Sequence, residues 1–215
     1  MMRELGLRGI TVRYHSIFEV SMRKTGLLAL ILLFGSVFSP RLASQVSPSK
    51  EALYAELRQP TSTDKAAEQL LRLAKRDNAV REYLDGKLPE MIESPTQDEV
   101  WVNAVRLAGE LNAPNTLSSL IKVLPHSRYG STVIVGFADS YGLANDPVGK
   151  ALYRFGDSAV PELSRLLGQG KRETRVRVAR ILWNIDSPAA RKALKAALEN
   201  DTDPAIKLFE NSKSS

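Results

Sequence analysis

Apolar residues recur at helical spacing along most of the chain from Thr63 onward. In "TDKAAEQLLRLAKRD" they occupy one face of a helix, namely Ala66, Ala67, Leu70, Leu71 and Ala74. Thr63 is expected to cap this helix, and Asp64 suits the positive end of the helix dipole. The same spacing continues through "NAVREYLDGKLPEMIES" at Val80, Tyr83, Leu84, Leu88, Met91 and Ile92. Residues 63–93 are therefore predicted to form a pair of helices.

The pattern predicts three more helix pairs, over residues 97–124, 146–168 and 173–199, with a terminal helix from Pro204. A shift of 74 residues places "NAVRLAGELNAPNTLSSLIKVL" on "RVARILWNIDSPAARKALKAAL", which reveals an internal repeat. The second helix of each unit opens at a proline, where the missing N–H group costs nothing, and these prolines are Pro114, Pro161 and Pro188. Residues 49–58 suit a short capping helix.

Each pair has an apolar face that it cannot bury alone, so neighbouring pairs must stack on one another. The predicted fold is all-α: an α-solenoid of helical hairpins over residues 63–211. Residues 45–62 form an N-terminal segment with the short helix, and residues 212–215 form a flexible tail.

One connection between helix pairs is longer than the others. Pro114 and Pro161 lie 47 residues apart, whereas Pro161 and Pro188 lie 27 apart, and the surplus corresponds to residues 125–145. Insertions in repeat proteins map to loops on one face, which is often the binding face. We interpret residues 125–145 as one irregular insertion in the helical stack, and call it the insert.

The insert contains "STVIVGFADSYG", which resembles a strand followed by an alanine variant of the hydrolase nucleophile elbow. Ser140 has no histidine after it, and the only histidine downstream of residue 44 is His126. A serine without a base is not activated, so we expect no catalysis here. Two alternatives remain: an ordered loop packed through Val133, Val135 and Phe137, or a loop that binds a partner through Tyr129, Phe137 and Tyr141.

The N-terminal region has the order of a secretory signal peptide. Arg23 and Lys24 precede an uncharged stretch at residues 25–38 and then "SPRLASQVS". We predict a signal peptide over residues 1–44, cleaved after Ser44, with Met22 as the true start, and export to the periplasm or outside the cell. The alternatives are an uncleaved anchor, which would be the only membrane contact, or a buried core helix.

Charge is distributed unevenly along the chain. The 215 residues include 30 Lys and Arg and 24 Asp and Glu, and residues 45–215 retain 24 and 22 of these. Residues 150–195 hold 11 basic and 4 acidic groups, whereas residues 45–149 hold 11 and 14. The stretch "GKRETRVRVAR" is therefore a candidate site for an anion or an acidic protein surface, through Lys171, Arg172, Arg175 and Arg180. The alternative is that Lys171 and Arg172 are ordinary turn residues that stay solvated. Nucleic acid is not expected, because the stretch lacks interleaved aromatic residues.

The sequence contains no motif typical of a metal or cofactor site. The chain has no cysteine, which excludes disulfides, thiolate zinc sites and cysteine nucleophiles. No acidic spacing matches a calcium loop and no glycine-rich phosphate loop is present, so no metal or cofactor is expected. Asp98, Glu99, Asp201 and Asp203 are expected to flank helix starts, where acids favour the dipole.

The segments "ALYRFGDSAVPELSRLL", "ETRVRVARILWNIDSPAARKALKAAL" and "DPAIK" resemble bacterial HEAT repeats of the phycobilisome-lyase-like type. The shared pattern is Ala-Val-Pro at 159–161, opening a helix, followed by an acid-x-x-Val-Arg step, seen here as Glu173, Val176 and Arg177. This resemblance implies that Arg177 pairs with an acid of the adjacent pair. It implies little about function, because such repeats serve unrelated tasks.

The sequence thus favours an exported, non-enzymatic HEAT-repeat protein that acts as a protein-interaction scaffold. Its concave face and the insert are the expected contact surfaces, and its partner is an unidentified protein. Two alternatives remain open: an accessory lyase-like protein that aids attachment of a prosthetic group, and a structural envelope protein.

Overall fold

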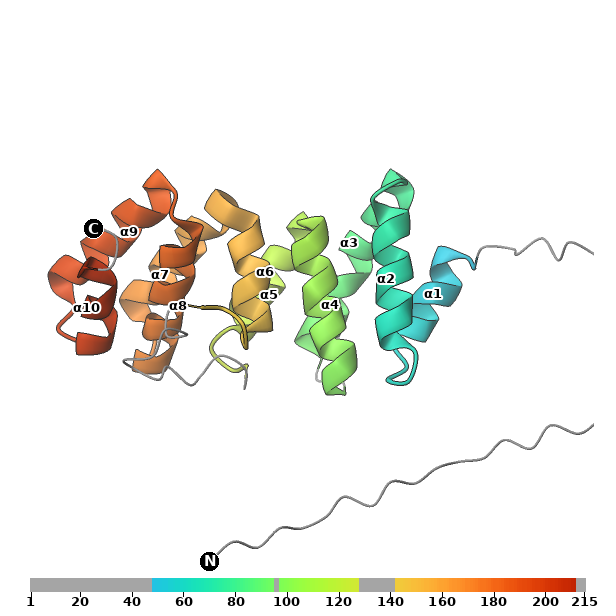
Figure 1. Cartoon of the computed structure of the whole chain (residues 1–215), viewed down its shortest axis with the longest axis horizontal. Coiled ribbons are helices and arrows are strands. Elements are labelled where there is room, and N and C mark those ends of the chain that lie inside the picture. The colour runs from blue at the N-terminus through green and yellow to red at the C-terminus, as the bar shows by residue number, and fades with distance from the viewer. Residues whose placement is uncertain (1–47, 95–96, 128–141, 212–215) are drawn as a thin grey trace, which may run out of the picture. The chain divides into compact units, whose positions relative to one another are not determined.

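Helices joined by short turns and loops make up the part of the chain whose structure is described. The computed structural model describes residues 48–94, 97–127 and 142–211, and no β-strand occurs within these three stretches (Figure 1). The all-α prediction is confirmed for them. In chain order the helices are α1 (Lys50–Leu57), α2 (Thr63–Ala74), α3 (Asn78–Glu93), α4 (Asp98–Leu111), η1 (Pro114–Thr116), α5 (Leu117–Val123), α6 (Pro147–Phe155), η3 (Gly156–Ala159), α7 (Val160–Gln169), α8 (Arg172–Ile185), α9 (Pro188–Asn200) and α10 (Pro204–Asn211).

The predicted pairs correspond to α2–α3, α4–α5, α6–α7 and α8–α9, and the terminal helix is α10. The predicted apolar faces are the buried ones: all five apolar positions of α2 are buried, and so are those of α3 apart from the half-buried Tyr83. The spacing of apolar residues alone identifies these buried faces, because α2 and α3 each bury one continuous apolar stripe.

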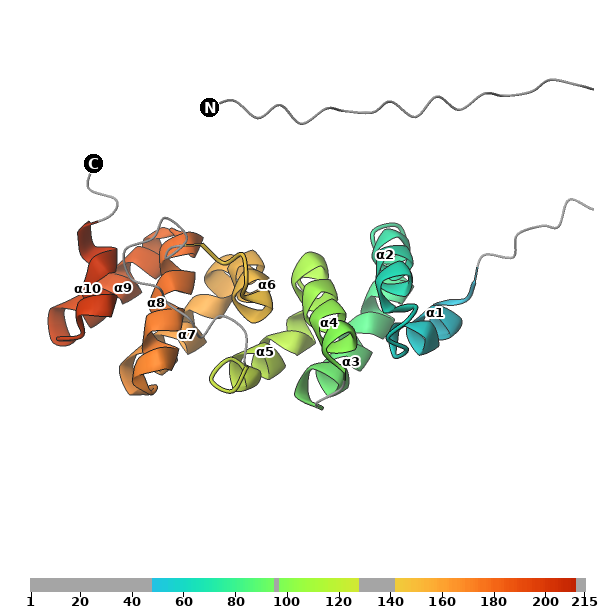
Figure 2. The same ribbon diagram turned by 60° about the horizontal axis from the view of Figure 1, so that its bottom comes forward.

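The helices of residues 47–215 lie in two rows, and contacts within each row link near neighbours. In the first row, α2 contacts α4, α4 contacts α6, α6 contacts α8, and α8 contacts α10. In the second row, α3 contacts α5 and α7 contacts α9. Figure 2 shows α3 and α5 below α2, α4 and α6, with the pairs following one another in chain order. Successive pairs are therefore in contact through their first-row helices.

The ends of equivalent helices repeat in detail. Asn112 ends α4 and Asp186 ends α8, both with left-handed backbone at φ 47° and 56°. These positions are 74 residues apart, which is the shift of the sequence repeat. Asparagine and aspartate tolerate this conformation better than most residues, so each can reverse the chain before the proline that opens the next helix. The proline prediction is confirmed at Pro161 and Pro188, whereas Pro114 opens the short 3₁₀ turn η1 before α5.

The predicted cap at Thr63 is wrong. Ser62 is the residue before α2, and its side chain makes no capping hydrogen bond. Thr63 is instead the first helical residue, is 1% exposed, and has its hydroxyl oxygen 3.4 Å from the Asn103 amide nitrogen of α4. Contact with the neighbouring first-row helix thus takes precedence over the local capping preference.

The short N-terminal helix packs against the repeat helices. Ser49 caps α1 by accepting a hydrogen bond from the Ala52 N–H group. Tyr54 of α1 meets Tyr83 of α3 edge to face, with ring centroids 5.8 Å apart. The described residues from 48 to 211 accordingly belong to one compact unit that includes this helix. The predicted signal peptide at 1–44 and the tail at 212–215 lie outside the described residues.

Candidate interaction surface

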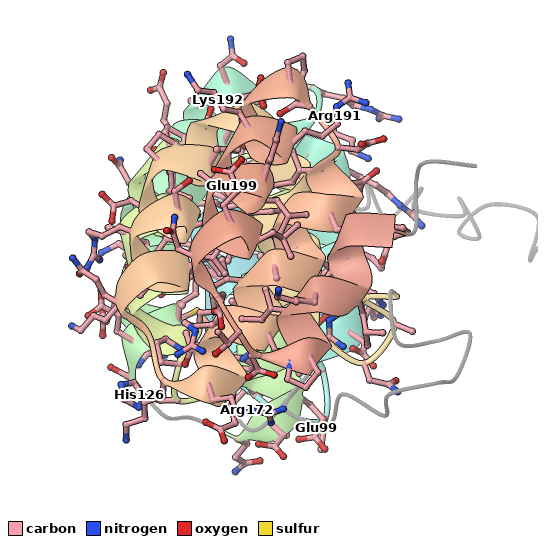
Figure 3. All side chains as sticks on the ribbon, turned by 90° about the vertical axis from the view of Figure 1, so that its left-hand side faces the viewer. Glu99, His126, Arg172, Arg191, Lys192 and Glu199 are labelled. Carbon is pink, nitrogen blue, oxygen red and sulfur yellow. The ribbon has the colours of Figure 1, made fainter. Side chains whose placement is uncertain are left out.

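The connections between successive helix pairs lie along one edge of the rows. Seen along the rows, Glu99 at the start of α4, His126 after α5 and Arg172 at the start of α8 lie at one edge, while Arg191 and Lys192 of α9 lie at the other (Figure 3). We call the first of these the inter-pair edge, defined by the described parts of the connections at 94–98, 124–146, 170–172 and 201–203. The described ends of the insert and the start of the basic stretch therefore lie at the same edge.

Acidic residues mark the helix starts along the inter-pair edge. Asp64 lies in the first turn of α2, Asp146 is the N-cap of α6, and Asp203 accepts a hydrogen bond from the Ala205 N–H group at the start of α10. Asp98 and Glu99 occupy the first turn of α4. The expectation that Asp98, Glu99 and Asp203 flank helix starts is confirmed, and each negative charge suits the local dipole.

Three of these acids are held by a side chain from a neighbouring first-row helix. Asn103 of α4 donates to Asp64 at 2.7 Å. Arg177 of α8 binds Asp146, and the Arg172 Nε atom lies 2.7 Å from Asp203 Oδ2. Asn103 and Arg177 are equivalent under the 74-residue repeat. Polar contacts between first-row helices thus recur along the edge.

Arg177 makes the most extensive of these contacts. Its Nε donates to Asp146 Oδ2 at 2.7 Å, its Nη2 donates to Asp146 Oδ1, and its Nη1 donates to the Leu124 carbonyl at 2.6 Å. Arg177 is 4% exposed, and the Asp146 side chain is 1% exposed. The resemblance implied that Arg177 pairs with an acid of the adjacent pair, and this pairing is confirmed.

Arg180 is buried, so its prediction as a partner-binding surface residue is wrong. It is 4% exposed, and its Nη2 lies 3.7 Å from Asp146 Oδ2. Burial lowers the pKa of its guanidinium; the Asp146 carboxylate opposes this effect, and the neighbouring Arg177 adds to it. The physical reason is that α8 contacts α6, α7, α9 and α10, and every residue from 176 to 182 is buried.

The other three basic candidates differ in how far they are engaged. Lys171 is exposed immediately before α8. The Arg172 side chain is 59% exposed and pairs with Asp203, whereas the Arg175 side chain is 26% exposed and binds both oxygens of Asp201, at 3.0 and 3.3 Å. The basic stretch is therefore largely balanced by the acids that precede α10. No spacing in the sequence relates these pairs, which lie 26 and 31 residues apart.

A cleft of about 530 Å³ lies between the ends of α7 and α9. The Arg175–Asp201 pair forms part of its wall, beside Leu167, Gly168, Asn200 and Thr202. Sequence reasoning did not identify this cleft, because it depends on how far apart two second-row helices pack.

A wider groove of about 730 Å³ separates α5 from α7. Leu117, Ile121 and Leu166 supply its apolar lining, and the exposed ion pair Glu162–Arg165 lies on its α7 side. Pro125, the first residue of the insert, also lines it, so the groove reaches the inter-pair edge.

The described residues offer no candidate metal centre. Among them, no group of three or more His, Asp or Glu side chains is placed to hold a metal ion. None of the described helices combines the length and apolarity needed to cross a bilayer. Ser140 and the candidate binding residues Tyr129, Phe137 and Tyr141 lie outside the described residues. At the C-terminal end of the insert, where residues 142–145 are described, Leu143 is buried and 8% exposed.

No protein-family model, curated protein or solved structure matches this chain.

Proposed function

We propose that the chain is an exported, HEAT-like α-solenoid that serves as a non-enzymatic scaffold for another protein, which it contacts along the inter-pair edge. The observation that carries this proposal is that the described ends of the insert and the exposed Lys171–Arg172 turn, two separately predicted features, lie at that one edge. Insertions in repeat proteins map to loops on one face, which is often the binding face, and this supports the choice of the inter-pair edge.

The polar character of the edge suits a reversible protein contact. Of the large hydrophobic residues whose exposure is described, only Tyr153 of α6 is strongly exposed, at 48%. Through the described residues of this surface, a partner is therefore recognised by charge, by hydrogen bonds and at the cleft beside the Arg175–Asp201 pair rather than through a broad apolar patch.

Site-specific photo-crosslinking in the native host tests the scaffold directly. A photo-reactive residue at Ser127 or Lys171, on the inter-pair edge, should trap the same polypeptide, identified by mass spectrometry. The matched control is Lys192, an exposed residue of α9 at the opposite edge. Equal capture from both edges, or none from the inter-pair edge, would contradict the proposal.

Purification from the native host distinguishes the alternatives. A scaffold gives a colourless protein, whereas a lyase-like accessory protein retains a chromophore that is visible in the absorption spectrum. A structural envelope protein stays with the insoluble envelope fraction. Export itself is tested by sequencing the N-terminus of the purified protein: we expect it to begin at Gln45, and a start at Met1 or Met22 would contradict cleavage.

A further inference from the structure

The insert is bracketed by two residues that bind the same buried side chain. Leu124 is the C-cap residue of α5, directly before the insert, and Asp146 is the N-cap of α6, directly after it. Arg177, which comes later in the chain on α8, donates to the Leu124 carbonyl and to both Asp146 carboxylate oxygens. One guanidinium thus spans the two ends of a 21-residue excursion, residues 125–145.

We propose that Arg177 is the anchor of the insert: α8 holds both ends of the excursion in place, so the insert's base opens whenever α8 separates from α6. Opening of the insert's base, at Leu124 and Asp146, is then coupled to separation of the helix pairs on either side of the insert. The anchor consists of described residues only, and it does not depend on what the insert binds.

The chemistry of both ends explains why an arginine is needed. The Leu124 carbonyl belongs to the last turn of a short helix, where carbonyl groups lack partners within the helix. The Asp146 carboxylate already accepts the Gly149 N–H group at 2.7 Å, and it requires a buried positive partner. The planar fork of arginine serves the carboxylate from two nitrogen atoms and the carbonyl from a third, whereas all three donors of lysine sit on a single nitrogen atom.

Gly149 provides an independent way to disturb one end only. A Cβ atom at this position would lie 2.6 Å from Asp146 Oδ2, so Gly149→Ala must displace the carboxylate. It leaves the Arg177–Leu124 hydrogen bond chemically possible. The variants Arg177→Lys and Gly149→Ala therefore separate loss of the whole anchor from loss of its α6 end.

Hydrogen exchange of backbone amides in the full chain measures both ends at once. The amides of Leu124, His126 and Ser127 report on the end of α5, and those of Gly149 and Lys150 report on the start of α6. Arg177→Lys should accelerate exchange at both reporters by about tenfold to a hundredfold, with α2 and α3 unchanged. Gly149→Ala should accelerate the α6 reporter far more than the α5 reporter. Arg175→Met is the matched control on the same helix. It should leave exchange at both reporters unchanged, because the partner of Arg175 is Asp201 and not a residue at either end of the insert.

The unaltered chain provides a test that needs no variant. Across a low-denaturant series, the α5 reporter, the α6 reporter and the amides at the start of α8 should open with one common denaturant dependence. An α5 end that opens separately in the unaltered chain, or an Arg177→Lys variant that accelerates only the α6 reporter, would overturn the anchor.

Discussion

Gly109 of α4 lies directly against Ala151 of α6, so closely that a Cβ atom on Gly109 would stand 2.7 Å from the Ala151 Cα atom. Both residues are buried, and they lie where the second and third helix pairs meet in the first row. The close approach involves backbone on the α6 side, so it cannot be relieved by rotation of a side chain. The joint between these pairs therefore depends on the absence of a side chain at Gly109.

We predict that Gly109→Ala destabilises the protein by about 1–3 kcal/mol, because overpacking outweighs the higher helix propensity of alanine. Gly86 of α3 is the matched control: it is exposed, and nothing lies within 4 Å of a Cβ atom added there. Gly86→Ala should raise the free energy of unfolding by about 0.4–1 kcal/mol. Urea unfolding of both variants checks that their free energies of unfolding change in opposite directions. A stabilised Gly109→Ala variant would refute the close packing of α4 and α6.

Leu163→Asp should unfold the chain. Leu163 of α7 is fully buried, so the substitution places an unpaired charge in the core at a cost of more than about 4 kcal/mol. Ser158→Asp, at an exposed position just before α7, is the control and should melt as the unaltered protein does. Circular dichroism during thermal melting provides the measurement, and a cooperative, unshifted transition for Leu163→Asp would show that its placement is incorrect.

The Glu93 link between α3 and α5 should give a defined pH dependence. Hydrogen bonds from Lys122 and Ser119 lower the pKa of Glu93 below its usual value of 4.5. Because the folded-state pKa is lowered, the stabilisation is present above pH 4.5 and is lost as the pH falls through the folded-state pKa.

The melting temperature of the unaltered protein should therefore exceed that of Glu93→Gln at pH 7, and the difference should shrink below pH 4.5. Glu199→Gln, which removes an exposed acid of α9, controls for the change in net charge. A difference that grows on acidification would contradict the sign.

Reversing the charge of Lys171, just before α8, and of Arg172, its first residue, should have unequal effects on stability. Lys171→Glu is expected to change the free energy of unfolding by less than about 0.5 kcal/mol, as for an ordinary surface site. Arg172→Glu should cost about 1 kcal/mol, because it removes the partner of Asp203 and places a like charge beside it. The difference should diminish in 1 M salt, where the screening length falls to about 3 Å. Equal melting of the two variants at low salt would argue against the Arg172–Asp203 pair.

Much of the helical framework is predictable because its signals are local. The apolar stripe of α2, the prolines at 161 and 188, and the equivalence of Asn112 with Asp186 all follow from periodicity, turn chemistry and the internal repeat. Arg177 also belongs to this group, since the resemblance to HEAT repeats implied its pairing.

The remaining features depend on the register between helices. Arg180 belongs to a basic stretch in the sequence, yet α8 is covered by four other helices, and periodicity identifies only the first buried face. Arg175 and Asp201 meet across 26 residues because α10 packs on α8. Thr63 leaves its expected capping role because Asn103 of the next first-row helix approaches it. A single sequence carries no local signal for such contacts.

The central claim, that the helix pairs stack in chain order as a solenoid, is tested most directly by spin-label distances. The chain has no cysteine, so cysteines introduced at Lys65 of α2, Lys150 of α6 and Lys207 of α10 can be labelled in pairs; all three sites are exposed and lie in the first turns of first-row helices. With about 10 Å between neighbouring axes, the account predicts about 20 Å for the 65–150 pair and about 40 Å for the 65–207 pair. A 65–207 distance equal to or shorter than the 65–150 distance would mean that the helices close into a bundle, and would contradict the account.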